Sequence, residues 1–401
     1  MTDRRIVIVG TGAAGLSVLE NLRRFGFTGQ VTMVGDERTP PYDRPPLSKR
    51  FLTGEWEPEQ LHLRSAESLD ELTATWVHDR AESVDIEARR LLLADGTAID
   101  YDELVICTGV RPRRLPLSDR ADGAHVLRTV DDARRLRERL DDRAQLLVTG
   151  GGFLGAEAAA TASSLGTRVT LLSPGPTPLV EALGPEVAGL LAERHRNHGV
   201  CLEQGRAQSV TASPEGIATG VVLDSGRRLP AENILMSIGS HPNVDWLARS
   251  GIADSDGIEC DEQGRAAPGV WAAGDIASWW RPELGRHVRL EHRTNATEQG
   301  MGVARAILGQ PPLTGPVPYV WSDQYDLKIQ IFGLPRAAES FEIIEGDIAD
   351  GRFTAVYGRD GRVCAAVGVN MVRPLRRLRR HVANQTSWSD LADLKPEPSM
   401  T

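Results

Sequence analysis

The chain has 401 residues, of which 41% are hydrophobic and 25% are charged, and its formal net charge is -9. This length allows two or three domains with a core in each, and the acidic balance argues against general nucleic-acid binding, which usually needs a basic face. No apolar run reaches the length of a membrane span, and "MTDRR" leads directly into an apolar strand without a signal-peptide core, so we expect a cytoplasmic protein.

The first predicted unit consists of a strand, a glycine loop and a helix. "IVIVGTGAAG" is an apolar strand that leads into Gly10, Gly12 and Gly15, and an apolar-periodic helix and the strand "VTMV" follow. In such a βαβ unit the first glycine permits a tight turn, the second lets the backbone approach a pyrophosphate, and the third lets helix and strand pack closely. Asp36 follows the second strand, where a carboxylate can hold the ribose hydroxyls of an adenosine.

The stretch "YDRPPLSKRFL" contains Lys49, which is the only lysine in the first half of the chain. Pro45 and Pro46 restrict the backbone ahead of it, so this corner is suited to hold a charge in one position. An ordinary surface turn is the alternative, and the stretch alone leaves both interpretations open.

A second copy of the βαβ unit starts at "LLVTGGGFLG", with Gly150, Gly152 and Gly155 at the spacing of the first three glycines. The likeness continues downstream, because "LLLADGTAIDYDELVICTGVRP" parallels "GVVLDSGRRLPAENILMSIGSHP". One GxGxxG is weak evidence, but two copies in a strand-glycine-helix-strand context indicate paired dinucleotide-binding modules. We therefore predict an α/β fold with two Rossmann-like dinucleotide-binding domains.

The two copies differ where the second strand ends. "VTLLSPGPTP" places Ser173 at the position that Asp36 has in the first copy. Loss of the carboxylate removes repulsion against a 2′-phosphate, although no arginine follows to bind one. Either the proline-rich segment reroutes a loop or the coenzyme preference has changed, so the sequence does not decide between NADH and NADPH.

Cysteine and histidine spacing predicts neither a dithiol nor a metal site. His195 and His198 have the HxxH spacing, but no further ligands are evident, and an exposed helix explains them. The four cysteines lie far apart without a CxxC pair, and we expect them to be buried free thiols: Cys107, Cys201, Cys260 and Cys364.

The segment "GVWAAGDIA" is an apolar strand that ends at Gly274 and Asp275. Here a glycine admits a ligand close to the backbone and the aspartate offers a carboxylate to hydroxyls, while a helix N-cap is the alternative. Next, "EHRTNATEQGMGVARAILG" predicts a helix from about Thr294 to Leu308, capped by Thr294 or Asn295. The N-terminus of this helix would stabilise negative charge on a nearby group.

These motifs, together with "PPYDRPPLSK", "LVICTGVRPR" and "PYVWSDQYDLKIQ", span from Ile6 to about Gly333. In this order they resemble the flavin-dependent ferredoxin reductases of bacterial oxygenase systems, of the putidaredoxin reductase and biphenyl dioxygenase reductase type. The resemblance implies a glutathione-reductase-like chain with a discontinuous FAD-binding domain at 1–112 and 241–312. It further implies an NAD(P)-binding domain at 113–240 and a C-terminal α+β domain at 313–401 that closes over the flavin.

The resemblance also implies cofactors and site residues. FAD would be the cofactor, NADH or NADPH the hydride donor, and an iron-sulfur ferredoxin that feeds an oxygenase the electron acceptor. Pro45 would lie against the isoalloxazine, and Lys49 near flavin N5 with Glu157 as its partner beside the nicotinamide. An exposed helix surface is the alternative for Glu157. Arg293 stands where relatives carry an apolar residue or Trp, and its cation would raise the flavin potential or point to solvent.

The other FAD positions implied by the resemblance are Gly10, Gly12, Ala14, Gly15, Asp36, Arg44, Ala81, Thr108, Gly109, Arg128, Gly274, Asp275, Glu291 and Trp321. The implied NAD(P) positions are Gly150, Gly152, Phe153, Leu154, Gly155, Glu157, Ser173, Ile238 and Gly239.

Partner binding is predicted from charge. The segment "RPLRRLRRH" would steer an acidic ferredoxin or would form a solvated helix face, and its arginines are Arg373, Arg376, Arg377, Arg379 and Arg380. We expect a monomer or weak homodimer, and we expect "HVANQTSWSDLADLKPEPSMT" to end in a disordered tail. Two rival functions stay open: an NAD(P)H-dependent flavin oxidase or quinone reductase, and a nicotinamide-responsive interaction protein resembling apoptosis-inducing factor.

Overall fold

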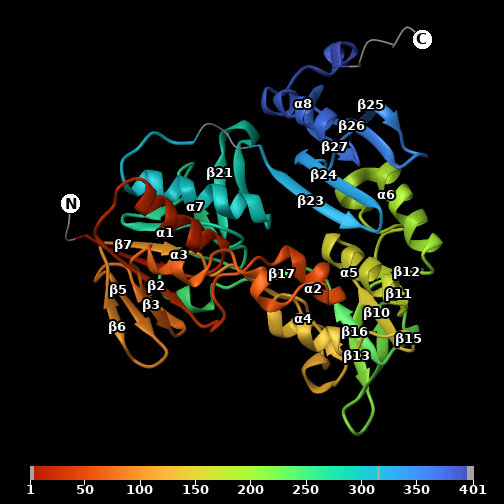
Figure 1. Cartoon of the computed structure of the whole chain (residues 1–401), viewed down its shortest axis with the longest axis horizontal. Helices are drawn as coiled ribbons and strands as arrows, with labels where there is room; N and C mark the ends of the chain where they lie inside the picture. Colours follow the sequence, from red (N-terminus) through yellow and green to blue (C-terminus); the bar gives the residue numbers. More distant parts are fainter. Residues whose placement is uncertain (1–3, 314–316, 395–401) are drawn as a thin grey trace. The chain divides into compact units, whose positions relative to one another are not determined.

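The computed structural model describes residues 4–313 and 317–394 (Figure 1). The chain divides into two compact units. The first unit comprises Met1–Asp43, Pro58–Arg111 and Ser240–Pro316, and the second comprises Arg44–Glu57, Pro112–Gly239 and Val317–Thr401. The three-domain boundaries expected from the sequence remain predictions, and the end of the expected tail, from residue 395 on, lies outside the described residues. Within the described ranges, no helix has both the length and the apolar composition needed to cross a membrane.

The first unit contains a six-stranded sheet with the order β19-β20-β7-β1-β2-β3. Its strand β1 (Arg5–Val9) pairs in parallel with β2 (Gln30–Gly35) and with β7 (Glu103–Ile106). The apolar run 6–9 is buried along its whole length, which is typical of a parallel sheet covered by helices on both faces. The remaining strands of this sheet are β3 (Thr75–His78), β19 (Arg265–Ala267) and β20 (Val270–Ala272).

Helices α1 (Ala13–Arg24) and α7 (Arg293–Ile307) lie side by side in the first unit (Figure 1). Their close approach depends on Gly300, because a Cβ atom there would lie 2.7 Å from the carbonyl oxygen of Ala14. This contact leaves no room for a side chain between the two helices.

The predicted cap of α7 is wrong. The helix begins one residue earlier than expected, and its N-cap is His292, whose side chain makes no capping hydrogen bond. Thr294 therefore lies inside the first turn. Asn295 is buried and donates through Nδ2 to the carbonyl oxygen of Leu290 at 3.2 Å, so its amide ties the preceding loop to the helix rather than capping it.

Two smaller sheets and several short helices complete the first unit. One sheet is an antiparallel β4-β5-β6 meander, and the other has the order β18-β21-β22. Their bounds and those of the short helices are β4 (Ala81–Asp85), β5 (Arg90–Leu93), β6 (Ala98–Asp100), β18 (Ile258–Cys260), β21 (Ala277–Arg281), β22 (Arg286–Arg289), η2 (Pro58–Leu61), α3 (Ala66–Asp70), η4 (Asp245–Leu247) and η5 (Pro282–Leu284). A separate two-stranded sheet pairs β17 (Ser240–Pro242) with β8 (Val110–Pro112).

The second unit repeats the architecture of the first, as the sequence predicts. Its parallel sheet has the order β12-β11-β10-β16-β9, so that β16-β10-β11 corresponds to β7-β1-β2. An antiparallel meander, β13-β14-β15, corresponds to β4-β5-β6. The strands and helices are β9 (Ala124–His125), β10 (Gln145–Thr149), β11 (Arg168–Ser173), β12 (Cys201–Gln204), β13 (Ala207–Ala212), β14 (Ala218–Leu223), β15 (Arg228–Pro230), β16 (Asn233–Met236), η1 (Pro45–Ser48), α2 (Arg50–Thr53), η3 (Ser118–Arg120), α4 (Val130–Arg137), α5 (Phe153–Ser164) and α6 (Val180–Asn197).

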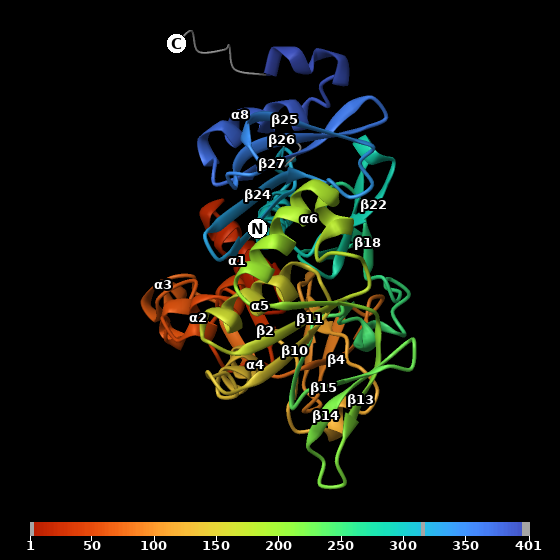
Figure 2. The same ribbon diagram turned by 90° about the vertical axis from the view of Figure 1, so that its right-hand side faces the viewer.

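The C-terminal part of the second unit is an antiparallel sheet with the order β23-β24-β27-β26-β25. Helix α8 (Val372–Ala383) lies against this sheet (Figure 2) and buries Leu375, Leu378 and Val382, which share one helical face. The other elements are β23 (Tyr319–Gln324), β24 (Leu327–Gly333), β25 (Ser340–Asp347), β26 (Arg352–Arg359), β27 (Arg362–Val369) and η6 (Trp388–Leu394). The predicted α+β character of this region is confirmed.

Candidate functional site

The first glycine loop has the geometry of a pyrophosphate cradle. Gly10 has a φ of +109°, and a Cβ atom there would lie 2.2 Å from the carbonyl oxygen of Cys107, while a Cβ on Gly15 would lie 2.0 Å from the carbonyl oxygen of Gly10. At Gly12, in contrast, no described residue other than its immediate chain neighbours comes within 4 Å of the Cβ position. The loop is therefore closed toward the sheet and open at the N-terminus of α1, whose first N–H groups have no side-chain cap.

Two neighbouring carboxylates at the end of β2 have different environments. Asp36 is exposed and, among the described residues, forms no hydrogen bond or ion pair. Glu37 accepts a hydrogen bond from the hydroxyl group of Tyr42 at 2.5 Å. Asp36 is therefore the carboxylate that remains available for ribose hydroxyls, and the glycine loop and this carboxylate together fit a dinucleotide such as FAD.

Gly274 and Asp275, which are predicted to bind the cofactor, follow β20, and Gly274 lies close to the start of α1. Gly274 has a φ of +83°, and a Cβ atom there would lie 3.0 Å from the Cβ of Ala14. Its N–H donates to Oε1 of Gln299 at 2.8 Å, a contact from α7 that sequence reasoning missed. A turn and strand β21 follow Asp275, so the interpretation of Asp275 as a helix N-cap is wrong.

Thr108, Gly109 and Ala81 lie elsewhere in the first unit. The hydroxyl group of Thr108 donates to the carbonyl oxygen of Asn243 at 3.1 Å, and the Asn243 amide donates back to the Thr108 carbonyl at 2.8 Å. The backbone N–H of Asn243 donates to Gly109 at 3.0 Å. These bonds fix the chain after β7, whereas Ala81 starts β4 in a different sheet and is buried.

The alternative in which the Arg293 side chain points to solvent is wrong. Its Nε atom lies 2.5 Å from Oδ1 of Asp43, and its guanidinium also donates to the hydroxyl group of Thr297. The Arg293 side chain is 24% exposed, so the ion pair is partly shielded from water. Asp43 belongs to the "PPYDRPP" motif, and the pair therefore anchors that motif to the first turn of α7.

Sequence reasoning named the neighbours of His292 but missed His292 itself. Its Nδ1 atom is buried and, among the described residues, has no hydrogen-bond partner. Burial lowers the pKa of His292, which keeps the imidazole neutral. Glu291 accepts hydrogen bonds from Ser240 at 2.5 Å and from Arg289 at 2.8 Å. An orphaned ring nitrogen at the start of α7 fits a polar atom of a ligand, and the "EHRTNA" motif was the available signal.

The second glycine loop repeats the first in the second unit. A Cβ atom on Gly150 would lie 2.0 Å from the carbonyl oxygen of Ser237, and one on Gly155 would lie 2.0 Å from the carbonyl oxygen of Gly150. Gly152 again has open space around its Cβ position within the described part of the chain. The other predicted members flank this loop. Phe153 and Leu154 begin α5, Leu154 is 37% exposed, and Ile238 and Gly239 follow β16.

Ser173 is tied into its own loop. The side chain is 4% exposed, and its hydroxyl group donates to the carbonyl oxygen of Gly175 at 2.9 Å. A Cβ atom on Gly151 would lie 2.6 Å from the Ser173 Cβ, so the proline-rich segment packs directly on the glycine loop. This geometry favours the rerouted loop over a side chain that reads the coenzyme.

Lys49 and Glu157 form a buried ion pair in the second unit. Lys49 Nζ lies 2.6 Å from Glu157 Oε2, and the side chains are 16% and 7% exposed. Glu157 Oε2 also accepts from the hydroxyl group of Ser48 at 2.7 Å, and Oε1 accepts from that of Ser322 at 2.7 Å. The Lys49–Glu157 pairing implied by the family resemblance is present, and the alternative of an exposed helix surface is wrong for Glu157.

The proline corner positions the lysine of this pair. Pro45 and Pro46 begin the 3-10 helix η1, and Lys49 is the junction between η1 and α2. Lys49 Nζ donates to the carbonyl oxygen of Pro45 at 3.2 Å. Two of its three N–H groups thus have partners, and the third has none among the residues that the structure describes. The ammonium group is therefore oriented and can donate one further hydrogen bond to a ligand.

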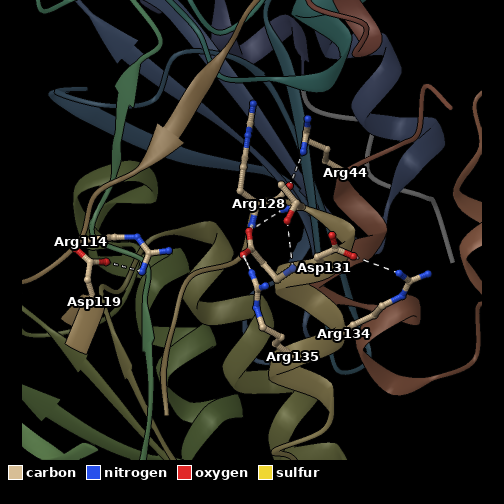
Figure 3. A network of polar contacts seen from close by, with 9 residues as sticks. Arg44, Arg114, Asp119, Arg128, Asp131, Arg134 and Arg135 are labelled. Atoms are coloured by element: carbon tan, nitrogen blue, oxygen red, sulfur yellow. Dashed lines mark hydrogen bonds and ion pairs between the residues drawn. The ribbon is translucent and has the colours of Figure 1, made fainter. Parts of the chain in front are cut away.

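Arg44 and Arg128 meet beside this corner. Arg44 Nη1 donates to the carbonyl oxygen of Arg128 at 2.6 Å (Figure 3). The loop at Arg128 is fixed by the capping box of α4, in which Thr129 and Asp132 exchange hydrogen bonds. Trp321 lies on β23, where its ring stacks with that of Tyr319 at a centroid distance of 6.0 Å.

Two predictions, that all four cysteines are buried and that both histidines of the HxxH spacing are exposed, are wrong in part. All four cysteines are free, but Cys201 is exposed and only Cys107 and Cys260 are buried. Burial raises the pKa of Cys107 to about 12, so this thiol is inert. His198 is exposed, but His195 is 0% exposed, because it continues the buried face of α6. The explanation of both histidines by an exposed helix is therefore wrong for His195.

The predicted arginine segment forms α8. Its apolar side packs on the C-terminal sheet, and the arginines occupy the opposite side and are exposed: Arg373, Arg376, Arg377, Arg379 and Arg380. This arrangement is a solvated helix face, and it also leaves five guanidinium groups accessible to an acidic partner.

The family model for pyridine nucleotide-disulphide oxidoreductases matches residues 4–300. The chain belongs to this family. A second family model, for the C-terminal domain of reductases, matches residues 319–400 of this pyridine nucleotide-disulphide oxidoreductase. Two dinucleotide cradles are the feature of the structure that agrees with the match, while the four free cysteines offer no disulfide for such an enzyme to use.

Curated and solved relatives of this oxidoreductase are similar over nearly the whole chain. Rhodocoxin reductase of Rhodococcus erythropolis is 34% identical over 383 residues, which cover 95% of this chain and 90% of the relative. The ferredoxin–NAD(+) reductase component of the anthranilate 1,2-dioxygenase system of Burkholderia cepacia is 37% identical over 389 residues, which cover 96% of this chain and 95% of the relative. The covalent putidaredoxin reductase–putidaredoxin complex contains a chain with a TM-score of 0.92 and 29% identity, covering 99% of this chain and 100% of that one.

Proposed function

We propose that this chain is a FAD-dependent NAD(P)H:ferredoxin reductase that supplies an oxygenase through an iron-sulfur ferredoxin. The observation that carries the proposal is the buried Lys49–Glu157 ion pair, with Nζ and Oε2 2.6 Å apart, in which Glu157 comes from the helix that begins in the second glycine loop. Such a pair holds a cation where negative charge develops. Membership in an oxidoreductase family and relatives named as a rhodocoxin reductase and a ferredoxin–NAD(+) reductase component support the same function.

The first unit would hold the cofactor. Gly10, Gly12 and the N-terminus of α1 would bind the pyrophosphate, and Asp36 would accept the ribose hydroxyls. His292 and Asp275 are polar groups for other parts of FAD. When it is bound, FAD accepts a hydride from NAD(P)H and releases the electrons one at a time.

Lys49 and Glu157 would act on the charge that this chemistry creates. We carry over from the family resemblance the positions of Pro45, Lys49 and Trp321 at the flavin and of Glu157 at the nicotinamide. Glu157 keeps the ammonium of Lys49 oriented. The remaining N–H of Lys49 would be available to donate to the group that accepts the hydride. The free thiols need no part in this scheme, which separates it from disulfide reduction.

The second glycine loop would hold the coenzyme. Gly150, Gly152 and the N-terminus of α5 would bind the NAD(P) pyrophosphate. Because Ser173 presents neither a carboxylate to a 2′-hydroxyl nor a cation to a 2′-phosphate, we propose that discrimination between NADH and NADPH is weak. The cytoplasmic location and the monomer or weak homodimer stay predictions.

Anaerobic stopped-flow mixing with NADH and with NADPH, followed by a two-iron ferredoxin, tests the proposal. Fast bleaching of the flavin and fast onward transfer to ferredoxin is the expected result. Bleaching without onward transfer, but with steady turnover on oxygen or a quinone, would replace it by the oxidase function. A long-lived complex of flavin and nicotinamide that hardly reduces ferredoxin would favour an interaction protein.

A further inference from the structure

A chain of buried hydrogen bonds leads away from Glu157 into the second unit. Glu157 Oε1 accepts from Ser322 at 2.7 Å, and Ser322 Oγ accepts from Nε2 of Gln324 at 3.2 Å. Gln324 Oε1 lies 3.2 Å from Nε2 of His195, and His195 Nδ1 lies 2.9 Å from the hydroxyl group of Tyr325. The chain thus joins α5, β23 and α6 through side chains alone.

The chemistry of each member fixes the direction of the bonds. A carboxylate can only accept, so the single proton of Ser322 goes to Glu157, and Ser322 must accept from the amide nitrogen of Gln324. The carbonyl oxygen of Gln324 then faces His195, which must donate from Nε2. The neutral imidazole accepts at Nδ1 from Tyr325. Every donor in the chain therefore points toward the Glu157 carboxylate, and such aligned bonds strengthen one another.

The side chains of this hydrogen-bond chain are buried, and a buried polar group without a hydrogen-bond partner destabilises the folded state. Ser322 and His195 are 0% exposed and Gln324 is 1% exposed. Burial lowers the pKa of His195 to about 4, which keeps the ring neutral, and burial raises the pKa of Tyr325, which keeps the proton on its hydroxyl group. The exposed ring of His198 stacks on Tyr325 at a centroid distance of 3.8 Å and closes the outer end. Three residues of the "WSDQYD" motif, Ser322, Gln324 and Tyr325, and both histidines of the HxxH spacing therefore belong to this one set of contacts.

We propose that Ser322, Gln324 and His195 are positioning residues that hold the carboxylate of Glu157 oriented toward Lys49. Ser322 occupies Oε1, so that Oε2 is left for Lys49 and Ser48, and the rotation of the carboxylate is locked. Gln324 and His195 hold Ser322 in the donating orientation. This inference rests on the proposed function, because it assigns these residues to the carboxylate that orients the reacting cation.

The kinetic test uses the holoprotein with Ser322→Ala, and with Ser322→Thr as the conservative variant that keeps the hydroxyl group. The matched control is Thr354→Val on the same sheet, because Thr354 is 1% exposed and its hydroxyl has no partner within the described residues. We expect S322A to slow flavin reduction at saturating NADH by roughly tenfold or more, since tenfold is the lower end of what one hydrogen bond to a charged group contributes. The NADH dissociation constant should hardly change, and S322T should recover most of the rate.

A second measurement depends neither on turnover nor on the Ser322 variants. Nitrogen-15 NMR of histidine-labelled wild-type holoprotein, assigned with His195→Asn, reports which ring nitrogen of His195 carries the proton. We expect the Nε2–H tautomer. A proton on Nδ1 would reverse the direction of the hydrogen bonds and overturn the inference. The inference is also overturned if NADH reduces the wild-type protein and S322A is reduced at the same rate as T354V. If neither NADH nor NADPH reduces the wild type, the proposed function falls first, and the inference falls with it.

Discussion

Replacement of Lys49 by methionine removes the ammonium group and keeps most of the length of the side chain. In the structure two of the three N–H groups of Lys49 are engaged by Glu157 and Pro45, so one donor is left to meet developing charge. A hydrogen bond to a charged group contributes about 1.5–3 kcal/mol, and each ~1.4 kcal/mol is a factor of ten in rate, so flavin reduction should slow roughly 10- to 150-fold. FAD content should change little, because the cradle and Asp36 belong to other elements.

Anaerobic stopped-flow reduction with NADH, at saturating coenzyme, measures this rate, and the flavin content of the purified variant measures binding. Arg50→Met is the matched control, because Arg50 is the next residue, is exposed, and places its guanidinium over the Trp56 ring at 5.3 Å rather than in the ion pair. Arg50→Met should reduce at the wild-type rate. The reasoning is refuted if Lys49→Met purifies without flavin, since Lys49 would then be a binding residue, or if both variants slow equally.

Three further predictions follow from single contacts. Asp36→Ala should weaken FAD binding roughly tenfold or more in a flavin-fluorescence titration, because a charged acceptor of ribose hydroxyls is lost, and unchanged affinity would place the ribose elsewhere. Because burial lowers the pKa of His195 from 6.5 to about 4, the unfolded state takes up its proton first. Stability is therefore full above pH 6.5 and falls by about 3 kcal/mol as the pH drops toward 4. His195→Gln should flatten that part of a melting-temperature profile, and a profile unchanged by it would contradict the assignment. Reversal of Arg376 and Arg377 to glutamate should lower the association rate with an acidic ferredoxin and its salt dependence, and identical kinetics would make α8 a solvated face only.

The features that the sequence predicted well depend on local sterics. Gly10 and Gly150 are fixed by left-handed φ values and by carbonyl oxygens about 2 Å from the Cβ position, and such requirements leave a readable spacing. The duplicated strand order could also be predicted, because the strands and the helix of each βαβ unit lie within about thirty consecutive residues.

Contacts between distant residues could not be read in this way. Lys49 and Glu157 are separated by 108 positions, Glu157 and Ser322 by 165, and Arg293 and Asp43 by 250. No period or spacing rule joins them, and for the first pair only the family resemblance supplied the connection. The prediction for Trp321 says nothing about Ser322, because neighbouring residues of a strand face opposite sides of the sheet.

His195 shows that part of the missing site was within reach. On α6 the buried residues Ala188, Leu191 and Ala192 precede it by seven, four and three positions, and this spacing puts His195 on the same face. The prediction of an exposed His195 followed the polar residue type, whereas the helical period predicts a buried position. A histidine at a buried helical position must find partners for both ring nitrogens. The period therefore already required a hydrogen-bond donor and an acceptor from another element, and the tertiary fold supplied Tyr325 and Gln324.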